Sequence, residues 1–117
     1  MSDLKNKNCT ACEGGAIPFD ISEIHKYQKK VDGWDIIKGN KDIYFLEKNF
    51  NFNNFKESQI FVNKVSEISE EEGHHPDINF GWGYAKINIT THAIEGLSEN
   101  DFILATKIDQ IINDENA

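Results

Sequence analysis

The feature that most constrains the fold is a long amphipathic stretch in the middle of the chain, residues 53–72. Its apolar side chains recur at helical spacing and form one stripe, made up of Phe55, Phe61, Val62, Val65 and Ile68. Asn53 is a suitable N-cap residue, and Gly73 provides a stop at the other end. The stretch therefore predicts the longest helix of the chain, although the glutamates at 70–72 place negative charge at its unfavourable end.

Strand patterns lie on both sides of this helix. Residues 34–38 and 42–49 have the pattern of two strands, and a short turn at 39–41 joins them into a hairpin. Residues 84–91 alternate between apolar and polar side chains, which is typical of a strand. A short extended segment over residues 78–80 would add a fourth strand.

Two further helices complete the pattern. We expect a first helix over residues 22–31 with Ser22 as its cap, and a last helix that starts at a capping-box-like pair, Ser98 and Asp101. This order predicts the α+β class, in which a four-stranded antiparallel sheet carries three helices packed on one face. We expect an irregular N-terminal arm over residues 1–19, a single domain over residues 20–113 and a frayed tail over residues 114–117.

Composition argues against several classes of function. The formal net charge is −8, and all 12 basic residues are Lys, so the chain lacks the arginines that nucleic-acid and phosphate recognition favour. No apolar run approaches the roughly 20 residues that cross a bilayer, and the N-terminus lacks the apolar core of a secretory signal. We therefore expect no nucleic-acid or membrane partner, a cytoplasmic location, and a small ligand without essential phosphate groups.

Cys9 and Cys12 form a CxxC pattern in the N-terminal arm. A structural zinc site would need four ligands, and the chain has no second cysteine pair. Two free thiols are the simplest interpretation, and a redox role or a metal shared between molecules is the alternative.

The residues best suited to chemistry near neutral pH gather in residues 70–92, which hold three of the four histidines. His74 and His75 are adjacent, and Pro76 favours an extended conformation in which neighbouring side chains point in opposite directions. That arrangement disfavours one metal held by both rings. Acid–base catalysis, a metal site completed by His92 and Glu70, and a loop with idle histidines all stay open.

Each remaining residue has an ordinary explanation when it is taken alone. His92 could be a surface residue at the end of a strand, and Asp101 could serve only as a helix cap. Trp82 could be a core residue or a flat wall for a planar ring. Their combined spacing is more specific, because three, five, nine and eight residues separate, in order, Glu70, His74-His75-Pro76, Trp82, His92 and Asp101.

This spacing resembles the signature of the pterin-4a-carbinolamine dehydratases. Residues 74–109 resemble the bacterial members almost continuously, and the amphipathic stretch upstream is also similar. The resemblance implies a small α+β sandwich that forms a homodimer or homotetramer. It assigns catalytic roles to His74, His75 and His92, supporting roles to Glu70 and Asp101, and substrate binding to Pro76 and Trp82.

The activity that the resemblance implies is the dehydration of 4a-hydroxytetrahydropterin, which aromatic amino-acid hydroxylases release, to quinonoid dihydropterin. Hydroxide leaves carbon 4a while ring nitrogen 5 loses a proton, so the reaction needs an acid and a base but neither a cofactor nor a metal. We expect Asp101 or Glu70 to orient a neighbouring histidine and to stabilise its charged form. Which histidine is the acid and which is the base stays open.

Ile78 marks a departure from many animal members of the family, which carry an aromatic residue two places after the proline. Stacking of the pterin ring would then rest on Trp82 or Pro76.

The resemblance also implies a functional link to an aromatic amino-acid hydroxylase, although another pterin could be the substrate. The alternative function is a non-catalytic interaction or accessory protein on the same scaffold, because some animal members also bind a transcription factor.

Overall fold

The computed structural model describes residues 17–115, so Cys9 and Cys12 lie outside the described residues. The described helices are α1 (Ile21–Gln28), α2 (Phe55–Glu72) and α3 (Glu99–Glu115). The strands are β1 (Asp35–Lys38), β2 (Tyr44–Asn51), β3 (Asp77–Gly81) and β4 (Tyr84–Ile89). Two short 3₁₀ turns, η2 (Asn40–Asp42) and η3 (His92–Ile94), complete the described elements.

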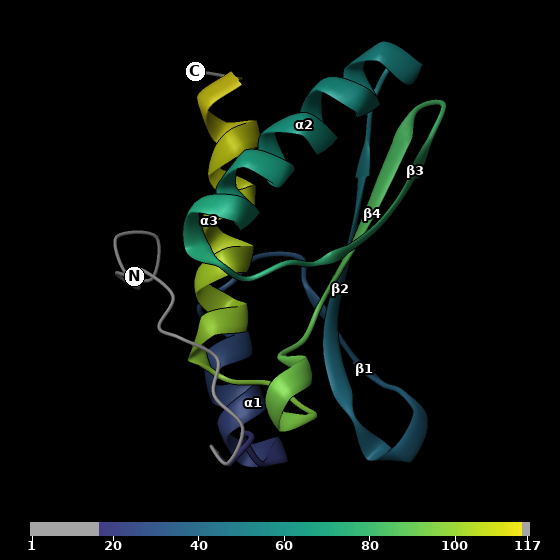
Figure 1. Cartoon of the computed structure of the whole chain (residues 1–117). Coiled ribbons are helices and arrows are strands. Elements are labelled where there is room, and N and C mark those ends of the chain that lie inside the picture. The colour runs from purple at the N-terminus through teal and green to yellow at the C-terminus, as the bar shows by residue number, and fades with distance from the viewer. Residues whose placement is uncertain (1–16, 116–117) are drawn as a thin grey trace.

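The four strands form one antiparallel sheet in the order β1-β2-β4-β3, and the helices lie on one face of it (Figure 1). This arrangement confirms the predicted α+β class and its four-stranded sheet. α2 packs on β3 and β4, α3 packs on α2, and α1 packs on α3. None of the helices within residues 17–115 is both long and apolar enough to cross a membrane.

The core lies between the sheet and the helices. β4 is a central strand, and its inward side chains, Ala85, Ile87 and Ile89, are fully buried, as the alternation in the sequence predicts. α2 contributes the fully buried Phe61 and Val65 to the same core. At about 25 cal/mol per Å² of apolar surface removed from water, side chains of this kind supply most of the drive for folding.

Helix starts differ from the sequence prediction by one or two residues, because neighbouring polar side chains compete for the cap. Asn53 is wrong as the cap of α2, since the side chain of Asn54 accepts from Glu57 N–H at 2.9 Å. Asp20 takes the place predicted for Ser22 and accepts from Glu23 N–H at 2.9 Å. α1 also ends at Gln28, earlier than the predicted residue 31.

Strand ends also differ from the sequence prediction, mainly because short turns form next to the strands. β2 begins at Tyr44 because residues 40–42 form η2, and it extends to Asn51. β3 spans Asp77–Gly81, which is longer than the short segment predicted at 78–80. β4 ends at Ile89, two residues early, because the chain turns into η3 beyond it. The shorter β4 places His92 in a turn, beyond the end of the strand.

A partly buried polar cluster formed by Trp34, Lys48 and Asp109 ties α3 to β2. Lys48 Nζ donates to Asp109 Oδ1 at 2.9 Å, and Trp34 Nε1 donates to Asp109 Oδ2 at 3.0 Å. Burial raises the pKa of the Asp109 carboxyl, and the hydrogen bond and positive charge of Lys48 oppose that rise.

Candidate active site

His74 and His75 lie in the short connection between α2 and β3. Gly73 ends α2 in the left-handed region at φ 65°, and the N–H groups of Gly73 and His74 both turn back to Ser69 O. Pro76 then leads into β3. The helix stop therefore fixes where the two histidines leave the helix and sends the chain towards the sheet.

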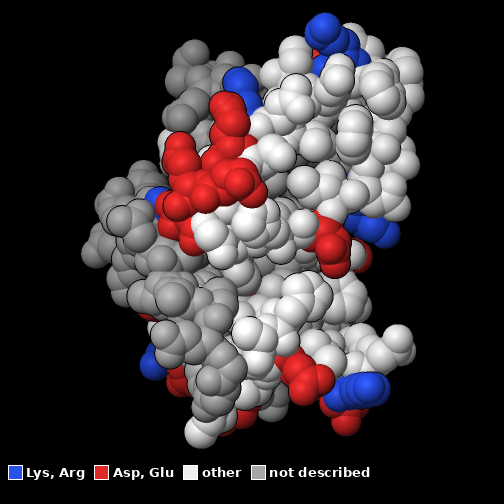
Figure 2. Space-filling view, viewed as in Figure 1, with Lys and Arg blue, Asp and Glu red and all other residues white. Residues whose placement is uncertain are grey.

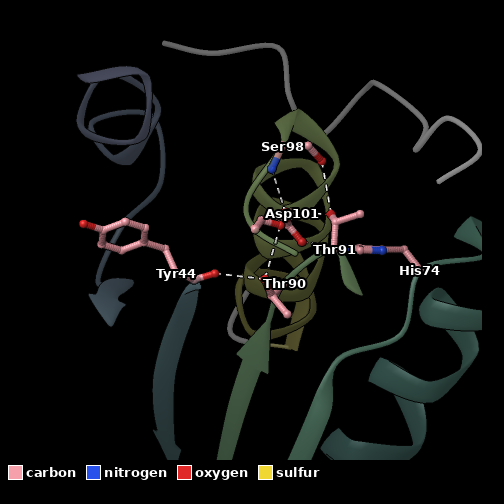
Figure 3. A network of polar contacts seen from close by, with 7 residues as sticks. Tyr44, His74, Thr90, Thr91, Ser98 and Asp101 are labelled. Atoms are coloured by element: carbon pink, nitrogen blue, oxygen red, sulfur yellow. Dashed lines mark hydrogen bonds and ion pairs between the residues drawn. The ribbon is translucent and has the colours of Figure 1, made fainter. Parts of the chain in front are cut away.

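His74 is held by a carboxylate from the start of α3. Its Nε2 lies 2.7 Å from Asp101 Oδ1, and the two side chains are 5% and 0% exposed. The other carboxylate oxygen, Asp101 Oδ2, accepts from Thr91 Oγ1 and from Ser98 N–H, each at 2.8 Å (Figure 3). Three donors thus surround a buried carboxylate, which offsets much of the cost of removing its charge from water.

The direction of each hydrogen bond follows from the donors available. An ionised carboxylate only accepts, so His74 Nε2 carries the proton of the His74–Asp101 hydrogen bond. Thr91 Oγ1 gives its one proton to Asp101, so Ser98 Oγ is the donor in the 3.1 Å contact with Thr91 Oγ1. These bonds assign neutral His74 the tautomer that carries its proton on Nε2.

His75 pairs with Glu70, which lies on the last turns of α2. Their Nε2 and Oε2 atoms are 2.5 Å apart, and both side chains are more than half exposed. An exposed pair of this kind contributes at most about 1 kcal/mol to stability. Its value is in orientation, because the contact directs one ring nitrogen of His75 towards the helix.

His92 is exposed in η3 and follows Thr91 directly. The turn is closed at its base by the pairing of Thr91 with Gly96, in which Thr91 N–H donates to Gly96 O at 2.9 Å. The single hydroxyl proton of Thr90 is shared between two carbonyl oxygens, Tyr44 O at 2.9 Å and Gly96 O at 3.2 Å, so the turn is also tied to β2. The His92 turn is thus attached to the same group of contacts that holds His74.

Trp82 is not brought to these histidines within the chain. It lies at the β3–β4 turn and is 71% exposed, so its interpretation as a core residue is wrong. Phe52 N–H donates to Gly83 O at 2.8 Å, which places this turn beside the start of α2, while His74 follows the end of α2 (Figure 1). α2 has 18 residues and is therefore about 27 Å long. A substrate-binding role for Trp82 stays a prediction.

The surroundings of the site are acidic. Residues 70–72 are three glutamates at the end of α2, where Figure 2 shows acidic side chains gathered on the surface. Lys107 Nζ lies 3.6 Å from Glu72 Oε2, so one of these charges is paired with α3. Such a surface disfavours anionic ligands, in keeping with a ligand without phosphate groups.

Thr91 is a site residue that sequence reasoning did not find. The alternation of β4 continues through it, since Ala85, Ile87 and Ile89 face inwards and Thr91 falls two residues later on the same face. A hydroxyl at a position where the pattern expects an apolar side chain was the available signal. Among the side chains that the structure describes, residues 17–112, no three His, Cys, Asp or Glu form a group that could hold a metal ion.

A protein-family profile described as pterin 4 alpha carbinolamine dehydratase matches residues 18–111. The chain belongs to this family. The pterin dehydratase relatives include proteins from Rubrobacter xylanophilus at 43% identity, covering 95% of this chain and 100% of the relative. Another, from Methylococcus capsulatus, is 45% identical and covers 92% of each chain. Both carry the provisional name pterin-4-alpha-carbinolamine dehydratase.

Two solved structures of the pterin dehydratase fold are similar to this chain. One is described as a transcriptional coactivator/pterin dehydratase from Brucella melitensis, with a TM-score of 0.73 and 23% identity over 80% of this chain and 97% of that one. It supports the fold alone. The other is described as a pterin dehydratase-like protein that is a RuBisCO assembly factor in the alpha-carboxysome, with a TM-score of 0.58 and 26% identity over 68% of this chain and 88% of that one.

Proposed function

We propose that this protein dehydrates pterin-4a-carbinolamine to quinonoid dihydropterin and water, and so acts as a hydro-lyase in tetrahydrobiopterin recycling. The observation that carries the proposal is the attachment of His74 and the His92 turn to one buried carboxylate, Asp101, in a chain of the pterin dehydratase family. His75 follows His74 directly, so all three candidate histidines belong to or adjoin this assembly.

The reaction requires two proton movements. The hydroxyl on carbon 4a takes a proton from an acid and leaves as water, and a base removes the proton from ring nitrogen 5. Imidazole exchanges protons near neutral pH and suits both roles. His75 and His92 are exposed and can meet a ligand directly, whereas His74 is nearly buried and its Nε2 is engaged by Asp101.

The supporting residues act on the histidines. Asp101 fixes the ring of His74, and Glu70 orients His75. Pro76 begins the segment that leads from the histidines to β3, where a flat pterin ring would pack. This mechanism uses no cofactor and no metal, because a protonated hydroxyl leaves from a carbon that the adjacent ring nitrogen already activates.

The decisive experiment supplies the carbinolamine with a purified pterin-dependent hydroxylase and follows the decay of its absorbance. We expect the protein to accelerate that decay over the spontaneous rate. His25→Ala is the matched control for substitutions of the site histidines, because His25 is an exposed histidine on α1 that contacts Gln28 at 3.3 Å, outside the site. A decay rate that equals the spontaneous one at all protein concentrations would refute the dehydratase proposal.

The proposal also covers the oligomeric state of the protein, its location and its partner enzyme. We expect a homodimer or homotetramer in the cytoplasm, with a functional link to an aromatic amino-acid hydroxylase. Light scattering coupled to size exclusion measures the oligomeric state directly, and a monomer at micromolar concentration would contradict this part.

A second candidate function is a non-catalytic interaction or accessory role. The similarity to the structure described as a RuBisCO assembly factor favours it, since a pterin dehydratase-like fold there is described in assembly. Co-purification separates the two functions. A partner that still binds a variant without His75 and His92 would support the accessory role. If no partner co-purifies and the protein has dehydratase activity, the accessory role is excluded.

A further inference from the structure

We propose that Thr91 is a positioning residue of the active site, which sets the orientation of the His74–Asp101 pair and anchors the turn that carries His92. The proposal rests on the proposed dehydratase function and assigns a role to a residue outside the seven that the spacing selected. Thr91 is 2% exposed, so its contacts are made inside the protein rather than with solvent.

The side chain of Thr91 acts on Asp101. Thr91 Oγ1 donates to Asp101 Oδ2 at 2.8 Å and accepts from Ser98 Oγ at 3.1 Å. With Ser98 N–H on the same oxygen, the carboxylate has two donors on one side, and its other oxygen is directed at His74 Nε2. Removing the hydroxyl leaves one donor on Oδ2 and allows the carboxylate to rotate away from the ring.

The backbone of Thr91 acts on the His92 turn. Thr91 N–H donates to Gly96 O at 2.9 Å, and Ile94 N–H donates to Thr91 O at 3.2 Å. His92 lies inside the turn that these bonds close. Thr91 therefore contacts the carboxylate that holds His74 through its side chain, as Figure 3 shows, and it closes the turn that carries His92 through its backbone.

The role of Thr91 is distinct from simple packing. Its position follows the buried face of β4, where Val would fit the apolar pattern and the volume at least as well. Val has nearly the shape of Thr without the hydroxyl, so a Thr91→Val variant removes the hydrogen bonds of that hydroxyl to Asp101 and Ser98 and keeps most of the packing. Thr91→Ser keeps the hydroxyl and removes only a methyl group.

The test compares Thr91→Val and Thr91→Ser with Thr106→Val as the matched control. Thr106 lies on α3 with its hydroxyl on Ile103 O at 2.8 Å, outside the site. We expect Thr91→Val to lower kcat about 10-fold with KM within about 2-fold, because misorientation forfeits part of the 10²-fold or larger benefit of a positioned acid or base. Thr91→Ser and Thr106→Val should stay near the parent rate. If Thr91→Val does not fold, Thr91→Cys replaces it, since a thiol is a much weaker donor.

A second readout does not depend on activity. Nitrogen-15 NMR of the histidine rings should show His74 protonated at Nε2 with a slowly exchanging proton in the parent protein, and Thr91→Val should accelerate that exchange at least 10-fold. An unchanged kcat in a folded Thr91→Val variant, an effect on KM alone, or an unchanged exchange rate would overturn the proposal. If the parent protein shows no dehydratase activity, the proposed function fails, and the exchange measurement still decides the positioning role.

Discussion

Replacing Asp101 with Asn is the most informative single perturbation of the site. The two groups have nearly the same shape, but the amide presents one acceptor oxygen and one donor nitrogen in place of two acceptors. Thr91 Oγ1–H and Ser98 N–H both point at Asp101 Oδ2, so they hold the amide oxygen of the Asp101→Asn variant on their side. Its NH₂ group then faces His74 Nε2, which must give up its proton and accept.

The magnitude follows from these contacts. The proton of His74 moves to Nδ1, which gives the ring the wrong tautomer, and we expect kcat to fall about 10²-fold or more. Three hydrogen bonds lose a charged acceptor, at about 1 kcal/mol each, and the lower cost of burying a neutral amide offsets part of that loss. A net loss of about 2 kcal/mol corresponds to a decrease in Tm of roughly 8 °C for a domain of this size.

Carbinolamine decay and thermal unfolding measure the two effects on the same sample. Asp20→Asn is the matched control, because Asp20 caps α1 at an exposed site and Asn caps a helix equally well. That control should change neither kcat nor Tm appreciably. An Asp101→Asn variant with the parent kcat and Tm would refute both the role of the carboxylate and the assignment of the His74 tautomer.

Two further predictions concern the other histidines and the Asp109 cluster. His75→Ala and His92→Ala should each lower the dehydration rate about 10²-fold, while His25→Ala keeps the parent rate, and parent-like rates in both site variants would remove the proposed catalysts. Because burial raises the pKa of Asp109, ionisation of this carboxyl costs folding free energy at neutral pH, and that cost disappears as the pH falls through its pKa in the folded protein. Urea unfolding of the parent protein and of Asp109→Asn should therefore show the free energy of unfolding of the parent rising relative to that of the variant as the pH falls from 7 towards 3.8, the ordinary pKa of the carboxyl. A difference between the two free energies that stays constant or falls would contradict this prediction.

The sequence by itself determined the kinds of element and their order. The apolar stripe of α2 and the alternation of β4 are local periodicities, so they predict a helix and a strand before any contact is known. The ends of these elements were harder to predict from the sequence, because Asn53 and Asn54 are both suitable caps and only the folded backbone selects Asn54. The resemblance to the pterin dehydratases, which the family match confirms, also rests on residue spacing alone.

Only the tertiary structure decided which of the selected residues meet. His74 and Asp101 are 27 positions apart, and they come together because the segment after α2 passes beside the start of α3. Trp82 is much nearer to His74 in sequence, yet β3 carries it to the far end of α2. Sequence spacing cannot predict which of these residues meets His74, because the direction of the chain between them depends on whether it runs on as an extended strand or reverses in a turn. The role of Thr91 also depends on the tertiary structure, because its buried hydroxyl finds a hydrogen-bond acceptor only when the fold places the carboxylate of Asp101 beside it.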